Sequence, residues 1–217
     1  MQINWLGRGT DGRFRLEAVP GVYDGYPPIS TFYIECEPLT VHDDVLAVAG
    51  VLLFGEYCSG TLELPRKVSP EVARAIQHFC LPSWVSVSPV ELEPRRNPLG
   101  EGLLFLTEDI RDMKPRSVWG EPRVSTLVSL SADEFSGSLF SHHGLITNSN
   151  ARTISTFSAA SAVFAQVAIA LLFAETFSAT QIELSDSLAS ELEPKDLVRL
   201  RGILGSCKIA LHTPNTN

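Results

Sequence analysis

One apolar stretch decides how this fold is read: Thr156-Phe-Ser-Ala-Ala-Ser-Ala-Val-Phe-Ala-Gln-Val-Ala-Ile-Ala-Leu-Leu-Phe-Ala-Glu-Thr-Phe177. Between Arg152 and Glu175 lie 22 residues without a formal charge, and Gln166 is the only polar residue from Val163 to Phe173. A helix that is apolar on every face is typical of the buried centre of a protein. We therefore expect a long helix over about 156–177, buried either by the chain's own sheet or by a partner subunit.

A membrane span is the alternative interpretation of this stretch, since a span needs about 20 consecutive apolar residues. The composition argues against it. Much of the apolar content is alanine, and the polar residues Ser155, Thr156, Ser158, Ser161 and Gln166 interrupt it. No basic cluster or aromatic belt flanks the stretch to orient it in a bilayer. We expect no membrane partner.

The chain beyond residue 103 alternates between short apolar runs and helical patterns. Strands are expected at 103–106, 124–130, 182–184 and 209–211, and a further helix at 194–204, with proline at its start and Gly205 at its end. This alternation of strands with helices is typical of an α/β layer with crossover connections.

The first 92 residues combine a hairpin with helices and are better described as α+β. We expect strands at 3–6, 14–19, 29–35 and 62–64, an extended segment at 84–92, and helices at 45–54 and from Ser69-Pro70 to a point before Pro82. The serine is a helix N-cap, and the proline occupies the first helical position.

The best linker in the chain is Glu93-Pro-Arg-Arg-Asn-Pro-Leu-Gly-Glu-Gly102, because its prolines and glycines interrupt any regular pattern. We predict an α+β domain over 1–92, this linker over 93–102, and an α/β domain with the long buried helix over 103–217. Together they make a mixed α/β fold. No internal repeat is visible in the sequence.

Charge and composition restrict the class of partner. The 217 residues are 44% hydrophobic and 19% charged, and 17 Lys+Arg against 25 Asp+Glu give a net charge of −8. Nucleic acids and anionic membranes bind through basic surface, so this balance disfavours both. A basic or cationic partner stays open.

The four cysteines, Cys36, Cys58, Cys80 and Cys207, lack the CxxC spacing of a zinc site or redox dithiol. We expect buried, reduced thiols, and neither a metal nor a cofactor. The first residues lack the basic start, apolar stretch and cleavage site of a signal peptide. These features favour a cytoplasmic protein.

The segment Gly7-Arg-Gly-Thr-Asp-Gly12 matches GxGxxG and follows an expected strand, as a dinucleotide-binding loop does. Such a loop must open a helix, whose N-terminal amides hold the pyrophosphate. Residues 13–19 alternate like a strand instead. We therefore interpret the glycines as a hairpin turn that does not bind nucleotides.

His142 and His143 are the most chemically suggestive pair, because imidazole is a common metal ligand and general acid or base. Asp133 and Glu134 lie nearby in sequence and are the carboxylates able to complete a catalytic site. Adjacent residues on a strand face opposite sides, however, and no HExxH or HxH spacing supplies further ligands. A solvated loop is the simpler explanation of all four residues, and we favour it over a catalytic site.

The order of elements resembles the 7-cyano-7-deazaguanine synthase-like branch of the PP-loop ATP pyrophosphatases. The resemblance lies in Gly60-Thr-Leu-Glu-Leu-Pro65 through Ser69-Pro-Glu-Val72, in Gly100-Glu-Gly-Leu-Leu-Phe-Leu106, and in Asn148-Ser-Asn-Ala-Arg152 with the long helix and Gln181-Ile-Glu-Leu184. The resemblance as a whole extends over about two thirds of the chain and includes no specific motif of the family.

The family's SGGxDS phosphate loop is replaced here by Thr107-Glu-Asp-Ile-Arg-Asp112. Carboxylates in place of glycines block the approach of a phosphate and repel its charge. The resemblance therefore implies a degenerate relative that neither binds nor cleaves ATP, and it transfers no catalytic residue.

Our leading hypothesis is a soluble, non-catalytic accessory or inhibitory subunit that binds another protein, in a homo- or hetero-oligomer. Every motif with enzymatic character has a structural explanation. Two alternatives stay open. One is an enzyme of unassigned reaction that uses His142 or His143 with Asp133 or Glu134, and the other is a sensor of a small nucleotide-like ligand on a degenerate nucleotide-binding scaffold.

Overall fold

The computed structural model describes residues 1–92, 100–113, 123–131, 136–141, 144–154 and 158–214. It is 35% helix and 34% strand, which confirms the mixed α/β class. The strands are β1 Gln2–Arg8, β2 Phe14–Val19, β3 Thr31–Ile34, β4 Gly60–Val68, β5 Val85–Val90, β6 Gly102–Thr107, β7 Val124–Ser131, β8 Ser138–Ser141, β9 Gly144–Ser149, β10 Ala179–Leu184 and β11 Ala210–His212. The helices are α1 Asp43–Phe54, α2 Pro70–Phe79, α3 Ala151–Ile154, α4 Ala159–Ala174, α5 Asp186–Ser190 and α6 Pro194–Ser206.

All of these strands belong to one sheet, in the order β11-β10-β6-β7-β9-β3-β2-β1-β4-β5, with β8 beside β9. The strands β6, β7, β9, β10 and β11 are parallel, whereas β1, β2 and β3 are antiparallel neighbours. The two parts of the chain join where Ile34 of β3 pairs antiparallel with Ser149 of β9. One hydrophobic core extends through both parts, and the domain division at 93–102 stays a prediction.

The same strand order occurs twice, as β3-β2-β1-β4-β5 and as β9-β7-β6-β10-β11. In each half one helix, α1 or α4, precedes the fourth strand of the set, and a second, α2 or α6, connects the last two. The halves differ in the direction of one strand, since β2 runs antiparallel to β1 while β7 runs parallel to β6. This repeat is one of strand order, and no internal repeat is visible in the sequence.

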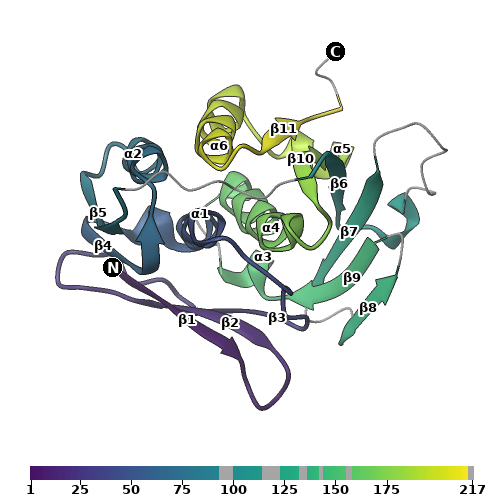
Figure 1. Ribbon diagram of the computed structural model, residues 1–217, viewed down its shortest axis with the longest axis horizontal. Coiled ribbons are helices and arrows are strands. Elements are labelled where there is room, and N and C mark those ends of the chain that lie inside the picture. Colours follow the sequence, from purple (N-terminus) through teal and green to yellow (C-terminus); the bar gives the residue numbers. More distant parts are fainter. Residues whose placement is uncertain (93–99, 114–122, 132–135, 142–143, 155–157, 215–217) are drawn as a thin grey trace.

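The sheet curves around α1 and α4, which lie side by side at the centre, while α2 and α6 pack together on the remaining side (Figure 1). Residues 161–174 of α4 are all buried, and so are residues 44–54 of α1. The expected buried helix is confirmed, and it belongs to the core of this chain. No helix in the described part of the chain is long and apolar enough to cross a membrane.

Local sequence signals explain most element boundaries. Ser69 caps α2 by accepting a hydrogen bond from the Val72 amide, as expected. The expected end of α6 at Gly205 is wrong, because the helix continues to Ser206 and the chain leaves it at Lys208, which has a positive φ of 61°. Glycine is required at Gly144, where an added Cβ would lie 1.9 Å from the Thr126 carbonyl oxygen of the neighbouring strand.

Candidate functional site at the carboxyl ends of the parallel strands

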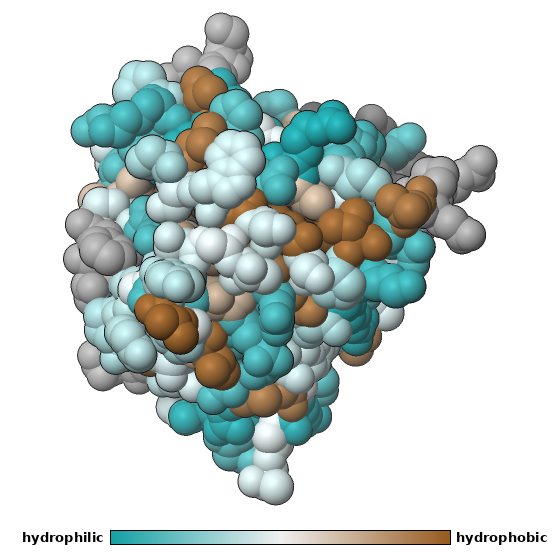
Figure 2. All heavy atoms as spheres, turned by 90° about the vertical axis from the view of Figure 1, so that its left-hand side faces the viewer, coloured by the Kyte–Doolittle hydropathy of each residue, from teal (hydrophilic) through white to brown (hydrophobic). Residues whose placement is uncertain are grey.

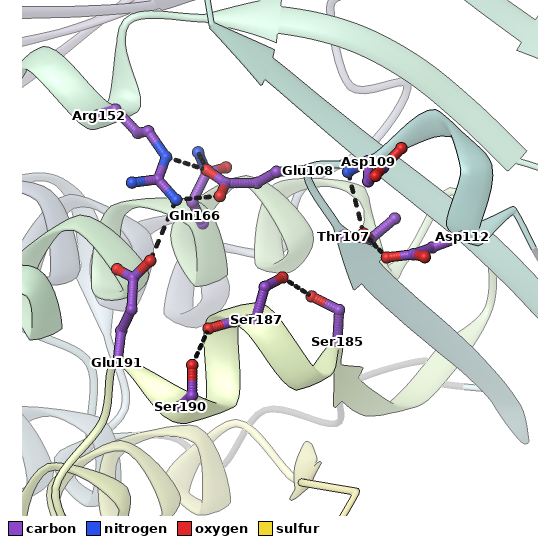
Figure 3. A network of polar contacts seen from close by, with 10 residues as sticks. All are labelled: Thr107, Glu108, Asp109, Asp112, Arg152, Gln166, Ser185, Ser187, Ser190 and Glu191. Atoms are coloured by element: carbon purple, nitrogen blue, oxygen red, sulfur yellow. Dashed lines mark hydrogen bonds and ion pairs between the residues drawn. The ribbon is translucent and has the colours of Figure 1, made fainter.

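A cleft opens where β6 and β10 end. Because these strands are parallel neighbours, the segments Glu108–Asp109 and Ser185–Ser187 leave the same edge of the sheet, which is where open α/β sheets bind ligands. Figure 3 shows the two segments facing each other. The cleft has a volume of 870 Å³ and is lined by Phe105, Glu108, Asp109, Ile110, Arg111, Asp112, Leu130, Glu183, Ser185, Asp186, Ser187 and Pro214.

On the face of the sheet that packs against α4, polar side chains form a row at this edge. Leu106, Leu127 and Leu145 pair across β6, β7 and β9, and all three belong to the core around α4. Side chains two residues further along each strand lie on the same face. These are Glu108, Ser129 and Thr147, which form the polar row between the sheet and α4.

Glu108 is the centre of the network in Figure 3. Its carboxylate accepts hydrogen bonds from the Arg152 guanidinium and, at 2.8 Å, from Nε2 of Gln166. Arg152 also pairs with Glu191, 3.3 Å away. Hydrogen bonding to Glu108 raises the pKa of Arg152 against the opposing effect of burial. Glu108 therefore already binds one guanidinium, which comes from α3.

Two buried polar atoms, on α4 and on β7, lack a hydrogen-bond partner within the part of the chain that the structure describes. Gln166 is 2% exposed, and its Oε1 has no hydrogen-bond partner among the described residues; the same holds for the Ser129 hydroxyl, and Ser129 is 1% exposed. A buried polar atom without a partner typically costs about 1–3 kcal/mol. Neither residue lines the cleft, so these two atoms belong to the packing between the sheet and α4 and not to the ligand-accessible surface.

Most of the charged side chains that line the cleft are carboxylates. Asp109 binds the Arg111 guanidinium through several hydrogen bonds of 2.6–3.0 Å, and these bonds lower the pKa of Asp109. Asp112 accepts a hydrogen bond from the Thr107 hydroxyl at 2.8 Å. Asp186 has no ion-pair partner in the described part of the chain. The lining thus contains five carboxylates and one arginine, whose charge Asp109 already neutralises.

The residues that the sequence nominated for catalysis, Asp133, Glu134, His142 and His143, lie outside the described residues. The catalytic hypothesis therefore stays a prediction. Within the described segments, no group of three or more His, Cys, Asp or Glu side chains is arranged to hold a metal ion. Sequence reasoning considered 107–112 only as a replaced phosphate loop and missed its role as a cleft wall. The signal that finds it is its position after a buried parallel strand.

The glycine-rich segment forms the β1–β2 turn, as expected. The Gly12 amide donates to the Gly9 carbonyl at 3.0 Å, and the Gly9 amide donates to the Arg13 carbonyl at 2.9 Å. The residues after Gly12 continue into β2 and do not open a helix.

All four cysteines are free thiols, and burial raises the pKa of each. The pKa of Cys58 rises to about 11 and that of Cys80 to about 12. Thiols with such values are poor nucleophiles near neutral pH.

No protein-family model, curated protein or solved structure matches the chain. The resemblance to PP-loop pyrophosphatases therefore stays a prediction.

Proposed function

We propose that the protein is a non-catalytic binding subunit, whose acidic cleft accepts lysine or arginine side chains of a partner protein. The observation that carries the proposal is the composition of the cleft lining, five carboxylates against one arginine, with Asp109 already paired to Arg111 and Glu108 to Arg152 of α3. An ammonium or guanidinium group in the cleft gains charge-assisted hydrogen bonds, which are about twice as strong as neutral ones.

Arg152 supports this choice of ligand. Its guanidinium forms ion pairs with Glu108 and Glu191. The chain therefore already contains an example of the contact that we propose for the partner.

The carboxyl-end position favours a second candidate function, a sensor of a small organic cation such as a polyamine. Its chemistry is the same as that of a basic peptide. The two candidates differ in whether the cation is free or belongs to a protein chain.

Calorimetry with hexalysine, spermidine and hexaglutamate tests both candidates. We expect hexalysine to bind, with affinity that falls as salt rises from 50 to 200 mM, and hexaglutamate not to bind. Spermidine binding that equals or exceeds hexalysine binding would favour the sensor.

The decisive variant is Asp186→Lys, since Asp186 has no ion-pair partner among the described residues and its replacement breaks no such contact. We expect at least tenfold weaker hexalysine binding. The matched control is Glu63→Lys, which makes the same change of charge at an exposed position on β4, in the other half of the sheet. Equal effects of the two variants would reject the cleft as the binding site.

A further inference from the structure

A second, smaller hollow lies on the opposite half of the molecule, between α2 and the turn that leads into β5. Its volume is 190 Å³, and its lining consists of Arg74, Gln77, His78, Leu81, Ser83, Trp84 and Val85. An apolar cavity of about 150 Å³ is large enough for benzene, so this hollow accommodates one aromatic or large aliphatic side chain.

Leu81 and Trp84 form the apolar walls of the hollow, and backbone hydrogen bonds fix the turn that carries them. Leu81 is 48% exposed and Trp84 is 82% exposed. The Ser83 amide donates to the Cys80 carbonyl at 3.0 Å, and the Trp84 carbonyl accepts from the Gly60 amide at 3.1 Å. The turn is thus fixed to both α2 and β4, and the indole is presented without contributing to the core.

Further apolar side chains lie on the neighbouring loop. Gly60, whose amide bonds the Trp84 carbonyl, follows Ser59 in the chain. The Ser59 amide donates to Asp24 at 2.7 Å, which places the loop around Asp24 beside the turn. Figure 2 shows this side of the molecule, where apolar side chains interrupt the hydrophilic surface. Exposed residues of this loop are Val22, Tyr23 and Tyr26, which are 93%, 85% and 80% exposed; they lie outside the lining of the hollow. Tryptophan and tyrosine are the residues that most often dominate binding energy at interfaces.

The charges of the hollow differ from those of the rest of the chain. Its ionisable side chains are Arg74 and His78, both exposed on α2, and its lining includes no carboxylate, although the chain carries a net charge of −8. This local charge is complementary to an acidic ligand. Two copies of a chain with this net charge repel each other at long range, which favours a different protein as the occupant.

We propose that the hollow between α2 and Trp84 is a docking site for a short acidic segment of a partner protein. The segment inserts one large apolar side chain between Leu81 and Trp84 and places a neighbouring carboxylate against Arg74. This site is separate from the acidic cleft and does not depend on the cation-binding function proposed there.

The test is selection of a displayed library of random octapeptides on the full chain, followed by fluorescence anisotropy with the enriched peptides. We expect enriched sequences that combine an aromatic residue or leucine with Asp or Glu. Trp84→Ala and Arg74→Glu should each weaken binding at least tenfold. Leu139→Ala, a matched change of an apolar residue that is 60% exposed on β8, should alter it less than twofold.

Circular dichroism first establishes that each variant is folded, which the exposure of Trp84 and Arg74 leads us to expect. Three results would overturn the proposal: no enrichment, enrichment of basic peptides, or binding that Trp84→Ala leaves intact. Concentration-dependent self-association that Trp84→Ala abolishes would also overturn it, because a second copy would then be the occupant.

Discussion

Gln166, in the middle of the buried helix α4, donates its side-chain amide to Oε1 of Glu108 over 2.8 Å. This bond links the one polar side chain between Val163 and Phe173 to the end of strand β6. It connects the core of the protein to the wall of the acidic cleft, and it explains why a polar residue occupies that place in the helix.

Charge in the buried helix should unfold the protein. Ile169 and Leu171 are both 0% exposed, so Ile169→Asp or Leu171→Asp forces a carboxylate into a core without a partner. We expect losses above about 4 kcal/mol in the free energy of unfolding, measured with urea. The control, Val198→Asp on α6, changes a residue that is 70% exposed, and its effect should stay within about 0.5 kcal/mol. Similar losses for all three variants would contradict the burial of α4.

Glu108 should matter more for stability than its neighbour Asp109. Glu108→Gln removes a charge that accepts hydrogen bonds from Arg152 and Gln166, and we expect a loss of about 1–3 kcal/mol in the free energy of unfolding. Asp109→Asn affects only contacts with Arg111, namely an exposed ion pair and a hydrogen bond from the Arg111 amide, so its effect should be much smaller. A larger loss for Asp109→Asn would mean that the network in Figure 3 does not stabilise the fold.

Asp24 should make stability depend on pH in the acid range. Burial acts to raise its pKa, but hydrogen bonds from the Met1 amine and the amides of Ser59 and Gly21 outweigh this and lower it. A carboxyl group whose pKa is lower in the folded state than its unfolded value of about 3.9 stabilises the fold above that pH. That contribution is lost as the pH falls through the folded pKa.

The measurement is a series of urea unfolding curves between pH 7 and pH 3 for the wild type and Asp24→Asn. We expect the variant to be less stable at pH 7 and to lose less stability on acidification. Parallel curves for the two proteins would show that Asp24 does not contribute to the acid dependence.

The thiols should all react once the protein is unfolded. A thiol reagent in denaturant without reductant should titrate four groups, since the structure contains four free cysteines. In the native protein Cys36, which is half-buried, should react before Cys58, Cys80 and Cys207, which are buried. A titre of two in denaturant would reveal a disulfide and contradict the free thiols.

Most of the architecture can be predicted from periodicity and caps. The alternation of the sequence predicts strand β2 at its observed bounds, Phe14–Val19, and in the structure its residues alternate between buried and partly exposed positions. The β8–β9 hairpin was missed. Polar residues occupy Thr147, Asn148 and Ser149, all buried at the end of β9, and their burial depends on neighbouring strands that are distant in sequence.

The candidate site escaped sequence reasoning for the same reason. Glu108, Arg152, Gln166 and Asp186 are far apart along the chain and share no motif. Only the parallel pairing of β6 with β10 and the packing of α4 bring them to one edge of the sheet. Local sequence patterns predict individual helices and strands. A site formed where strands end depends on the order of the strands in the sheet, which such patterns do not show.

Mapping of hexalysine on the isotopically labelled protein by NMR tests the central claim most directly. We expect the amide shifts to concentrate at Glu108–Asp112 and Ser185–Ser187, the two walls of the acidic cleft. The shifts should be lost in Asp186→Lys and kept in Glu63→Lys. Shifts that spread over all acidic surface residues, or that persist in Asp186→Lys, would contradict the assignment of the cleft as a cation-binding site.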